Sequence, residues 1–171
     1  MPVTELAYVV HERFVEGVKS LAEQLDSDGW RPDFIAGIGR GGLVPAVFLS
    51  HATGVTLLSV DHSSKVKTFG DVLLRRLAKK TAAGKRILIV DDINDSGRTL
   101  AYLRTAIADA GGKAVNLRIA VLIDNIRSCE TVDYRAETID RESDARWFVF
   151  PWEAMAPREE ALTEAAALHN A

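Results

Sequence analysis

The feature of this sequence that most limits its fold is the apolar run Ile87-Leu88-Ile89-Val90, which ends abruptly in two adjacent aspartates. The run shows no alternation between apolar and polar residues, so both faces of the strand that it forms must be covered by protein. Central strands of parallel sheets have this property, because helices pack on both sides of them. We therefore expect an α/β fold in which residues 85–92 supply a central strand.

Strand and helix patterns alternate along the rest of the chain. Short apolar runs predict strands at 34–38, 54–60 and 116–124. Helical periodicity predicts helices at 6–25, 43–53, 100–110 and, at the end of the chain, 157–170. Residues 61–84 are polar and basic, and we expect a long surface loop with some helix near 72–77. Without repeats or linkers, this order favours one α/β domain with a parallel sheet.

Composition excludes several classes of function. The 171 residues carry a net charge of only -3, which provides no general positive field for nucleic acid. No apolar run is long enough to span a bilayer, and the N-terminal residues lack the apolar centre of a signal peptide. The single cysteine, Cys129, excludes an internal disulfide and fits a reducing compartment. We expect a cytoplasmic protein without nucleic-acid or membrane partners.

The acidic pair Asp91 and Asp92 lies where an open α/β sheet binds its ligand, at the carboxyl end of a strand. Carboxylates repel phosphate, so they suit a ligand that also brings hydroxyl groups, a divalent cation or developing positive charge. A phosphorylated sugar with magnesium supplies all three. We therefore expect Asp91 and Asp92 to face such a sugar, with Asp95 nearby.

The turn after these acids is suited to phosphate. Gly97 permits close backbone approach at the start of a helix, where unpaired N–H groups favour an anion. Ser96 and Thr99 add hydroxyl donors, and Arg98 either assists or points into water. The alternative is that Asp95 or Ser96 only caps the helix.

A second cluster, GIGRGGLVPA at residues 37–46, also follows a predicted strand. Gly39, Gly41 and Gly42 around Arg40 indicate a tight loop whose backbone contacts an anion, with a cationic side chain beside it. Glycine-rich turns before helices are common, so this cluster gains its meaning from the acidic one. Together they predict two anion sites on either side of one hydroxyl-rich group.

At this point a family resemblance appears. ILIVDDINDSGRTL (87–100) resembles the phosphoribosyl-pyrophosphate motif of type I phosphoribosyltransferases, and residues 37–46 resemble their pyrophosphate loop. VDHSSKVK (60–67) resembles the start of their flexible active-site loop. RWFVFPWE (146–153) resembles the hood segment of the bacterial xanthine–guanine branch and its purine-salvage relatives.

The resemblance, which extends from about residue 34 to 153, implies a fold and an activity. The fold is a parallel-sheet core flanked by helices with a small C-terminal hood, in a single domain over 1–171. The core would cover about 30–125 and the hood about 126–156, with N- and C-terminal helical segments. Members transfer 5-phosphoribosyl from phosphoribosyl pyrophosphate to a nitrogenous base, with magnesium, and release pyrophosphate. A purine-type base, a role in nucleotide salvage and a homodimer or homotetramer are implied for this chain.

The resemblance also implies roles in donor binding. Asp91 and Asp92 would hold the ribose hydroxyls, directly or through Mg²⁺. The backbone from Asp95 to Thr99 would cradle the ribose-linked phosphate, and Arg40 and Gly41 would meet the pyrophosphate.

For the base, the resemblance implies that Asp95 accepts or shares its proton. Trp147 would stack on the ring, and Phe148 would contact the ring edge through its backbone. An indole face suits an aromatic base. Trp147 and Trp152 also fit the alternative of plain core residues.

One position departs from the family pattern. In its six-oxopurine enzymes a lysine near the end of the strand after the phosphate helix reads the base oxygen, and Asp124 or Asn125 stands there in this chain. Aspartate accepts hydrogen bonds where lysine donates them. Either the base bears an amino group, as adenine and cytosine do, or a donor comes from elsewhere, such as Asn125 or Arg127.

Two further alternatives concern the activity itself. One is a non-catalytic regulator that keeps the donor site and binds RNA or another protein. The other is a magnesium-dependent phosphohydrolase with Asp91 as nucleophile, although that activity leaves the Gly-Arg-Gly loop without a purpose.

Overall fold

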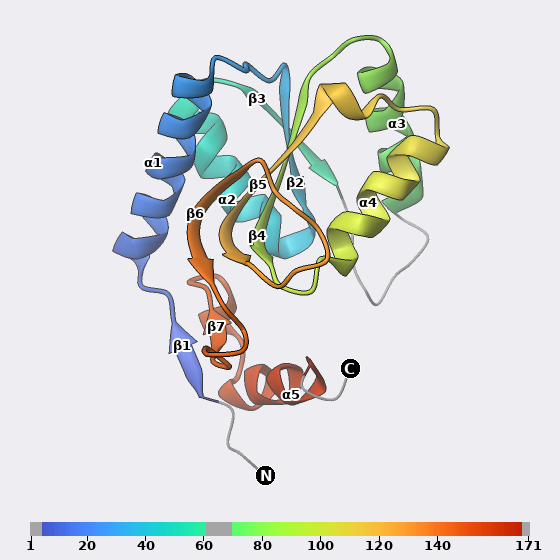
Figure 1. The fold of residues 1–171 in the computed structure, drawn as a ribbon. Coiled ribbons are helices and arrows are strands. Elements are labelled where there is room, and N and C mark those ends of the chain that lie inside the picture. The colour runs from blue at the N-terminus through green and yellow to red at the C-terminus, as the bar shows by residue number, and fades with distance from the viewer. Residues whose placement is uncertain (1–4, 61–69, 169–171) are drawn as a thin grey trace.

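A five-stranded parallel sheet forms the centre of the protein in a computed structural model, which describes residues 5–60 and 70–168 (Figure 1). The strand order is β3-β2-β4-β5-β6, with every neighbouring pair parallel. The strands are β2 (Phe34–Ile38), β3 (Thr56–Val60), β4 (Ile87–Asn94), β5 (Leu117–Asn125) and β6 (Tyr134–Ile139). The α/β fold with a parallel sheet is confirmed.

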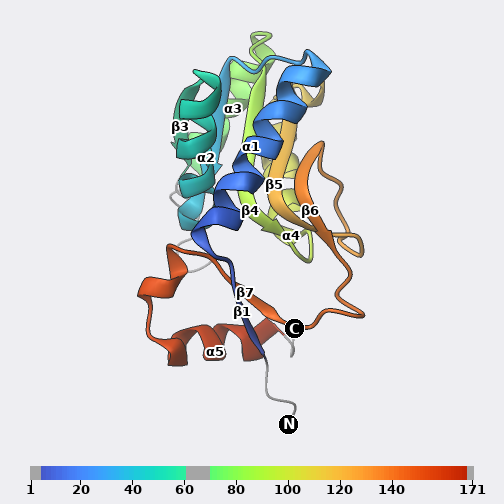
Figure 2. The same ribbon diagram turned by 90° about the vertical axis from the view of Figure 1, so that its left-hand side faces the viewer.

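Helices cover both faces of this sheet (Figures 1 and 2). The pair α1 (His11–Asp28) and α2 (Gly39–Thr53) packs on one face, and the pair α3 (Gly70–Ala82) and α4 (Arg98–Asp109) packs on the other. The apolar run of β4 serves both layers, since Leu88 and Val90 join the first core and its other two residues join the second. All four side chains of the run are fully buried, as the lack of alternation predicted.

A hood lies beyond the carboxyl ends of the main strands, as Figures 1 and 2 show. It contains a two-stranded parallel sheet of β1 (Leu6–Tyr8) and β7 (Trp147–Val149), with Leu6 opposite Trp147. The 3₁₀ turn η2 (Glu153–Met155) and helix α5 (Arg158–Leu168) follow. The expected helix from residue 6 is therefore wrong in its first turn, because residues 6–8 hydrogen-bond to β7 and the helix begins only at residue 11.

Two other expected boundaries also differ from the structure. The segment expected as a loop with a little helix contains all of α3, which buries Leu74, Leu77 and Ala78 against the sheet. The apolar stripe of α3 is narrow and basic residues surround it. The sequence therefore did not predict the full helix. Residues 61–69, which hold most of the expected flexible-loop motif, lie outside the described residues. Of the residues expected in the hood, Tyr134–Ile139 instead complete the main sheet as β6.

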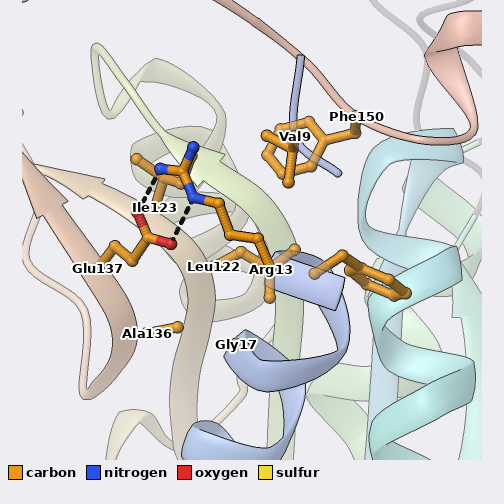
Figure 3. A pocket seen from close by; sticks show the side chains of 9 residues that line it. Val9, Arg13, Gly17, Leu122, Ile123, Ala136, Glu137 and Phe150 are labelled. Atoms are coloured by element: carbon orange, nitrogen blue, oxygen red, sulfur yellow. Dashed lines mark hydrogen bonds and ion pairs between the residues drawn. The ribbon is translucent and has the colours of Figure 1, made fainter. Parts of the chain in front are cut away.

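A paired charge joins the first helix to the last strand of the sheet. Arg13 of α1 and Glu137 of β6 form a bidentate ion pair at the edge of a cavity of about 10 Å³, shown in Figure 3. Such a cavity has room for roughly one water molecule. It is therefore a packing defect where hood and core meet rather than a substrate pocket.

Among the described helices, none is both long and apolar enough to cross a membrane.

Candidate functional site

The glycine loop after β2 lies directly against the acidic end of β4. A Cβ atom on Gly41 would lie 2.4 Å from Oδ2 of Asp92, and one on Gly42 would lie 2.2 Å from the backbone oxygen of Val90. At Gly42 the contact is with backbone, so glycine is required there, whereas a side chain at position 41 would have to displace the carboxylate of Asp92. Arg40 lies exposed in the same turn, at the start of α2. The structure thus brings together the two clusters that lie about fifty positions apart in the sequence.

The two aspartates at the end of β4 have backbone partners but no cation. Oδ1 of Asp91 accepts a hydrogen bond from the N–H of Asp92 at 3.0 Å, and Oδ1 of Asp92 accepts one from the N–H of Ile93 at 2.8 Å. Among the described residues neither carboxylate forms an ion pair. They therefore remain available to a ligand.

The surroundings of these aspartates disfavour negative charge. Burial, with the neighbouring charge of Asp92 as the next cause, raises the pKa of Asp91 well above its ordinary value. Burial, with the charge of Glu153 as the next cause, raises the pKa of Asp92 to about 7. Crowded carboxylates without a counter-charge are stabilised by any cation that binds between them. The site therefore suits a ligand that brings or develops positive charge.

Glu153 is a member of this acidic group that the sequence reasoning missed. It comes from the hood, where its carboxylate accepts a hydrogen bond from the N–H of Phe150 at 3.0 Å. Burial raises the pKa of Glu153, and the positive charge of Arg40 partly opposes that rise. The one signal in the sequence was its position at the end of the RWFVFPWE motif, in which only aromatic residues had been assigned roles.

The start of α4 has the geometry expected of a phosphate-binding turn. Gly97, the N-cap residue, has φ of 83° and ψ of -7°, the left-handed conformation that favours glycine, and Oγ of Ser96 accepts a long hydrogen bond of 3.4 Å from the N–H of Arg98. A Cβ atom on Gly97 would lie 2.6 Å from Oγ of Ser128 and 2.8 Å from Sγ of Cys129, so the turn is backed by the loop after β5. Ser96 and Thr99 lie on either side of it, exposed and half-buried respectively. A helix start whose N-cap residue is a glycine without a capping side chain is suited to an anion.

Asp95 is held by a residue for which the sequence analysis predicted no role. Nε and Nη2 of Arg141 donate to Oδ1 and Oδ2 of Asp95 at 2.8 and 3.0 Å, which makes a bidentate ion pair between β4's loop and the hood. The side chain of Asn125 donates to the backbone oxygen of Asp95 at 3.0 Å. Neither partner was predicted for Asp95, because Arg141 lies in an irregular segment without a motif.

Asp124, expected near the base, is instead committed to the protein. Its carboxylate accepts a hydrogen bond from Nδ2 of Asn94 at 2.8 Å and pairs with Arg135 at 3.5 Å. Asn94 also accepts from Oγ of Ser128 at 2.8 Å, so these buried polar groups form one network across β4 and β5. These contacts explain why an acid stands at this position, because Asp124 links β5 to β4 at the end of the sheet where the candidate site lies.

The aromatic residues of the hood separate into two environments. Phe148 is buried, and the guanidinium groups of Arg13, Arg141 and Arg146 lie within 5.4 to 5.9 Å of its ring centre. Trp147 is half-buried and, as the preceding strand residue, projects to the opposite side of β7.

Trp152, by contrast, is a packing residue. It stacks on Phe150 with the ring centres 5.0 Å apart and also contacts Phe14 edge-on. Its role in the core matches the alternative given for it from the sequence.

The donor set fits magnesium if substrate or water supplies further oxygens. Asp91 and Asp92 offer the hard oxygen ligands that Mg²⁺ prefers. Within residues 5–60 and 70–168, no group of three or more His, Cys, Asp or Glu side chains is arranged to hold a metal ion. Mg²⁺ is usually bound by one or two carboxylates together with substrate phosphates, so two unpaired aspartates are sufficient on the protein side.

Comparisons with known proteins agree with this architecture. The family model of the phosphoribosyl transferase domain matches residues 6–157. The xanthine-guanine phosphoribosyltransferase of Cereibacter sphaeroides is 31% identical over 147 residues, which cover 79% of this chain and 79% of that protein.

Solved structures show the same similarity. The purine phosphoribosyltransferase of Pyrococcus horikoshii has a TM-score of 0.67 at 32% identity and covers 88% of this chain and 95% of its own. The xanthine-guanine-hypoxanthine phosphoribosyltransferase of Helicobacter pylori, at 20% identity and a TM-score of 0.66, shares the fold over 92% of this chain and 99% of that one. By its matched domain, its parallel sheet and the position of its acidic and glycine loops, this chain belongs to the phosphoribosyltransferase family.

Proposed function

We propose that this protein transfers 5-phosphoribosyl from phosphoribosyl pyrophosphate to a purine base and releases pyrophosphate, as an enzyme of nucleotide salvage. The observation that carries the proposal is the contact between the Gly41 loop and Asp92, which places two helix starts suited to anions on either side of unpaired carboxylates. The donor has a phosphate at one end, a pyrophosphate at the other and hydroxyls between them. The relatives named for purine bases support the choice of acceptor.

Each end of the donor has a suitable partner in this arrangement. The backbone from Asp95 to Thr99 binds the 5-phosphate at the start of α4. Arg40 and the N–H groups around Gly41 bind the pyrophosphate at the start of α2. Asp91 and Asp92 accept hydrogen bonds from the ribose hydroxyls.

The same acids serve the chemistry. The bond from the anomeric carbon to the pyrophosphate oxygen breaks, and a ring nitrogen of the base forms the new bond to that carbon. Positive charge develops on the sugar as pyrophosphate leaves with the electron pair, and the carboxylates of Asp91 and Asp92 stabilise it. Mg²⁺, held by Asp91 and Asp92 together with substrate oxygens, would neutralise charge on the departing pyrophosphate.

Asp95 takes the proton that the base loses when its ring nitrogen bonds to the sugar. Its ion pair with Arg141 fixes the carboxylate just after the acidic pair, and this supports a position between the sugar and the base. Trp147 supplies a flat apolar surface for the ring, and the backbone of Phe148 contacts its edge.

The structure weakens the case for adenine or cytosine. That alternative rested on a free acceptor at Asp124, whereas the carboxylate is buried and is held by Asn94 and Arg135. A buried carboxylate held between two protein donors is poorly placed to accept from an amino group of the base.

The test is an assay of pyrophosphate release with phosphoribosyl pyrophosphate, Mg²⁺ and one base at a time: hypoxanthine, guanine, xanthine, adenine or cytosine. We expect turnover with at least one purine. Donor binding without turnover on any base would replace the proposal with a regulator, and phosphate-ester hydrolysis without a base would favour a phosphohydrolase. Omitting Mg²⁺ from the same assay tests whether turnover requires the metal.

A homodimer or homotetramer and a cytoplasmic location stay predictions.

A further inference from the structure

The ion pair between Asp95 and Arg141 lies where the hood covers the acidic loop. Both side chains are mostly buried, with 24% and 21% of their surfaces exposed. Nε and Nη2 of Arg141 each use one N–H bond on Asp95. Nη2 has a second N–H bond, which has no acceptor among the described residues. Each oxygen of Asp95 likewise retains a lone pair beyond the one that Arg141 occupies.

The guanidinium of Arg141 is fixed in place from three sides. Its Nη1 donates to the backbone oxygens of Asp144 at 3.2 Å and Arg146 at 2.5 Å. Its Cζ lies 5.4 Å from the ring centre of Phe148, a cation–π contact. A donor that is already oriented loses little entropy when a ligand accepts from it. Arg141 is therefore a preorganised hydrogen-bond donor rather than a mobile surface arginine.

Among the described residues, the other side-chain donors considered for an oxygen on the base are already bound to protein groups. The strand β5 ends in Asp124, which only accepts, and in Asn125, whose side-chain amide is held by its hydrogen bond to the backbone oxygen of Asp95. Arg127 is turned away to Asp140 and Glu142 on the surface. Among the described residues, Arg141 alone hydrogen-bonds to the carboxylate of Asp95.

We propose that Arg141 determines base specificity, so that the site selects 6-oxopurines over 6-aminopurines; the proposal rests on the transferase function above. The outer edge of the pair presents a donor, Nη2–H, beside an acceptor, Oδ2 of Asp95. A 6-oxopurine with a proton on N7 presents the complementary order, an acceptor at O6 beside a donor at N7. Adenine places an amino donor at the first of these positions. Opposed donors are left unpaired, which sites built for hydrogen bonding penalise strongly.

The experiment compares kcat/KM for hypoxanthine, guanine and adenine in the wild type and in Arg141→Met, which keeps the apolar stem. We expect the variant to lose roughly 10- to 100-fold with the two oxopurines, the value of a charge-assisted hydrogen bond, and little with adenine. The dissociation constant for phosphoribosyl pyrophosphate should not change. Arg141→Lys keeps the cation and a donor, so it should recover part of the preference.

The matched control is Arg146→Met on the same segment of the hood. Arg146 also lies over Phe148 but pairs with Asp144 and does not touch Asp95, so its ratio of oxopurine to adenine efficiency should equal that of the wild type. An equal loss for all bases in Arg141→Met would mean that Arg141 only supports the hood, and would overturn the inference. A wild-type preference for adenine would do the same. If Arg141→Met does not fold, an unchanged ratio in Arg141→Lys and in Arg141→Gln serves as the refutation. Turnover with no base at all would instead remove the proposed function.

Discussion

Carboxylates at the two ends of the central sheet have opposite electrostatic environments. At the amino end, Asp28 accepts hydrogen bonds from Tyr134 and Arg118, and these partners lower its pKa. Arg118 in turn lies 4.8 Å from the ring centre of Trp30. At the carboxyl end, neither Asp91 nor Asp92 pairs with a cation among the described residues, and the pKa of each is raised.

This difference separates what holds the fold from what serves a ligand. At the amino end, Asp28 is paired with Tyr134 and Arg118, and this cluster serves the fold rather than a ligand. The unpaired acids at the carboxyl end leave the protein less stable than it would be with neutral residues there, which is common where a site awaits charged substrate. The cost is recovered when the ligand binds, because binding to the folded state alone increases its stability.

The largest contrast should appear when the same chemical change is made at each end. Asp95→Asn removes the group that takes the proton of the base, so we expect kcat to fall by about 100- to 10,000-fold while donor binding persists. Asp28→Asn at the amino end should keep turnover and lower the midpoint of thermal unfolding. Steady-state kinetics, donor titration and thermal denaturation check both. Equal loss of donor binding and turnover in Asp95→Asn would reject its place beside the base.

A second contrast concerns backbone packing at the two ends. Gly42→Ala places a methyl group against the backbone of β4 and should cost about 3 kcal/mol of unfolding free energy, together with donor binding. Gly84→Ala, at the amino end of the same strand, meets open space and is strained only by its φ of 84°, so about 1 kcal/mol is expected. Urea denaturation of both variants gives the comparison. A smaller cost for Gly42→Ala than for Gly84→Ala would show that the loop and β4 are not in contact.

The third contrast is the dependence of stability on pH. The folded protein has a pKa of about 7 at Asp92, against an ordinary value near 4, so between these pH values it keeps a proton that the unfolded chain has lost. The free energy of unfolding therefore decreases as pH rises from 4 to 7, and the loss is complete above 7. Without ligand, Asp92→Asn should be more stable than the wild type at pH 8 by roughly 2 kcal/mol, a value discounted for partial exposure, and equal to it at pH 4. A difference that does not vary with pH would contradict this.

The smallest effect is expected from Tyr134→Phe. The hydroxyl donates to Asp28 at 2.5 Å and accepts from Arg118, and its loss should lower the free energy of unfolding by about 1 kcal/mol. Turnover should remain that of the wild type, because the cluster lies at the far end of the sheet. Reduced turnover at full folding would mean that the two ends communicate.

Much of this molecule could be predicted because local patterns and packing agree. The run Ile87–Val90 predicted a strand buried on both faces, and its position next to two acids predicted the edge at which the site lies. The glycines at 41 and 42 were expected to form a tight loop whose backbone contacts an anion; the structure shows that the loop packs against β4, and the anion contact stays a prediction.

What escaped prediction depends on contacts between distant parts of the chain. Residues 6–8 fit a helical pattern, yet they become a strand because residues 147–149 offer unpaired backbone groups. Arg141 has no local pattern at all, and its significance arises only from folding back onto Asp95. The partners of Asp124 could not be predicted, because a sequence shows the type of a side chain but not the groups that it binds in the fold.

The pairing of β1 with β7 joins nearly the first described residues of the chain to residues about 140 positions further along. During synthesis Leu6–Tyr8 emerge early and wait without a partner until Trp147–Val149 follow, whereas the main sheet can close once Ile139 has left the ribosome. A nascent chain thus completes the sheet edge that carries Asp91 and Asp92 before it acquires the hood. Removing residues 1–8 would take β1 away and return the finished protein to that immature stage.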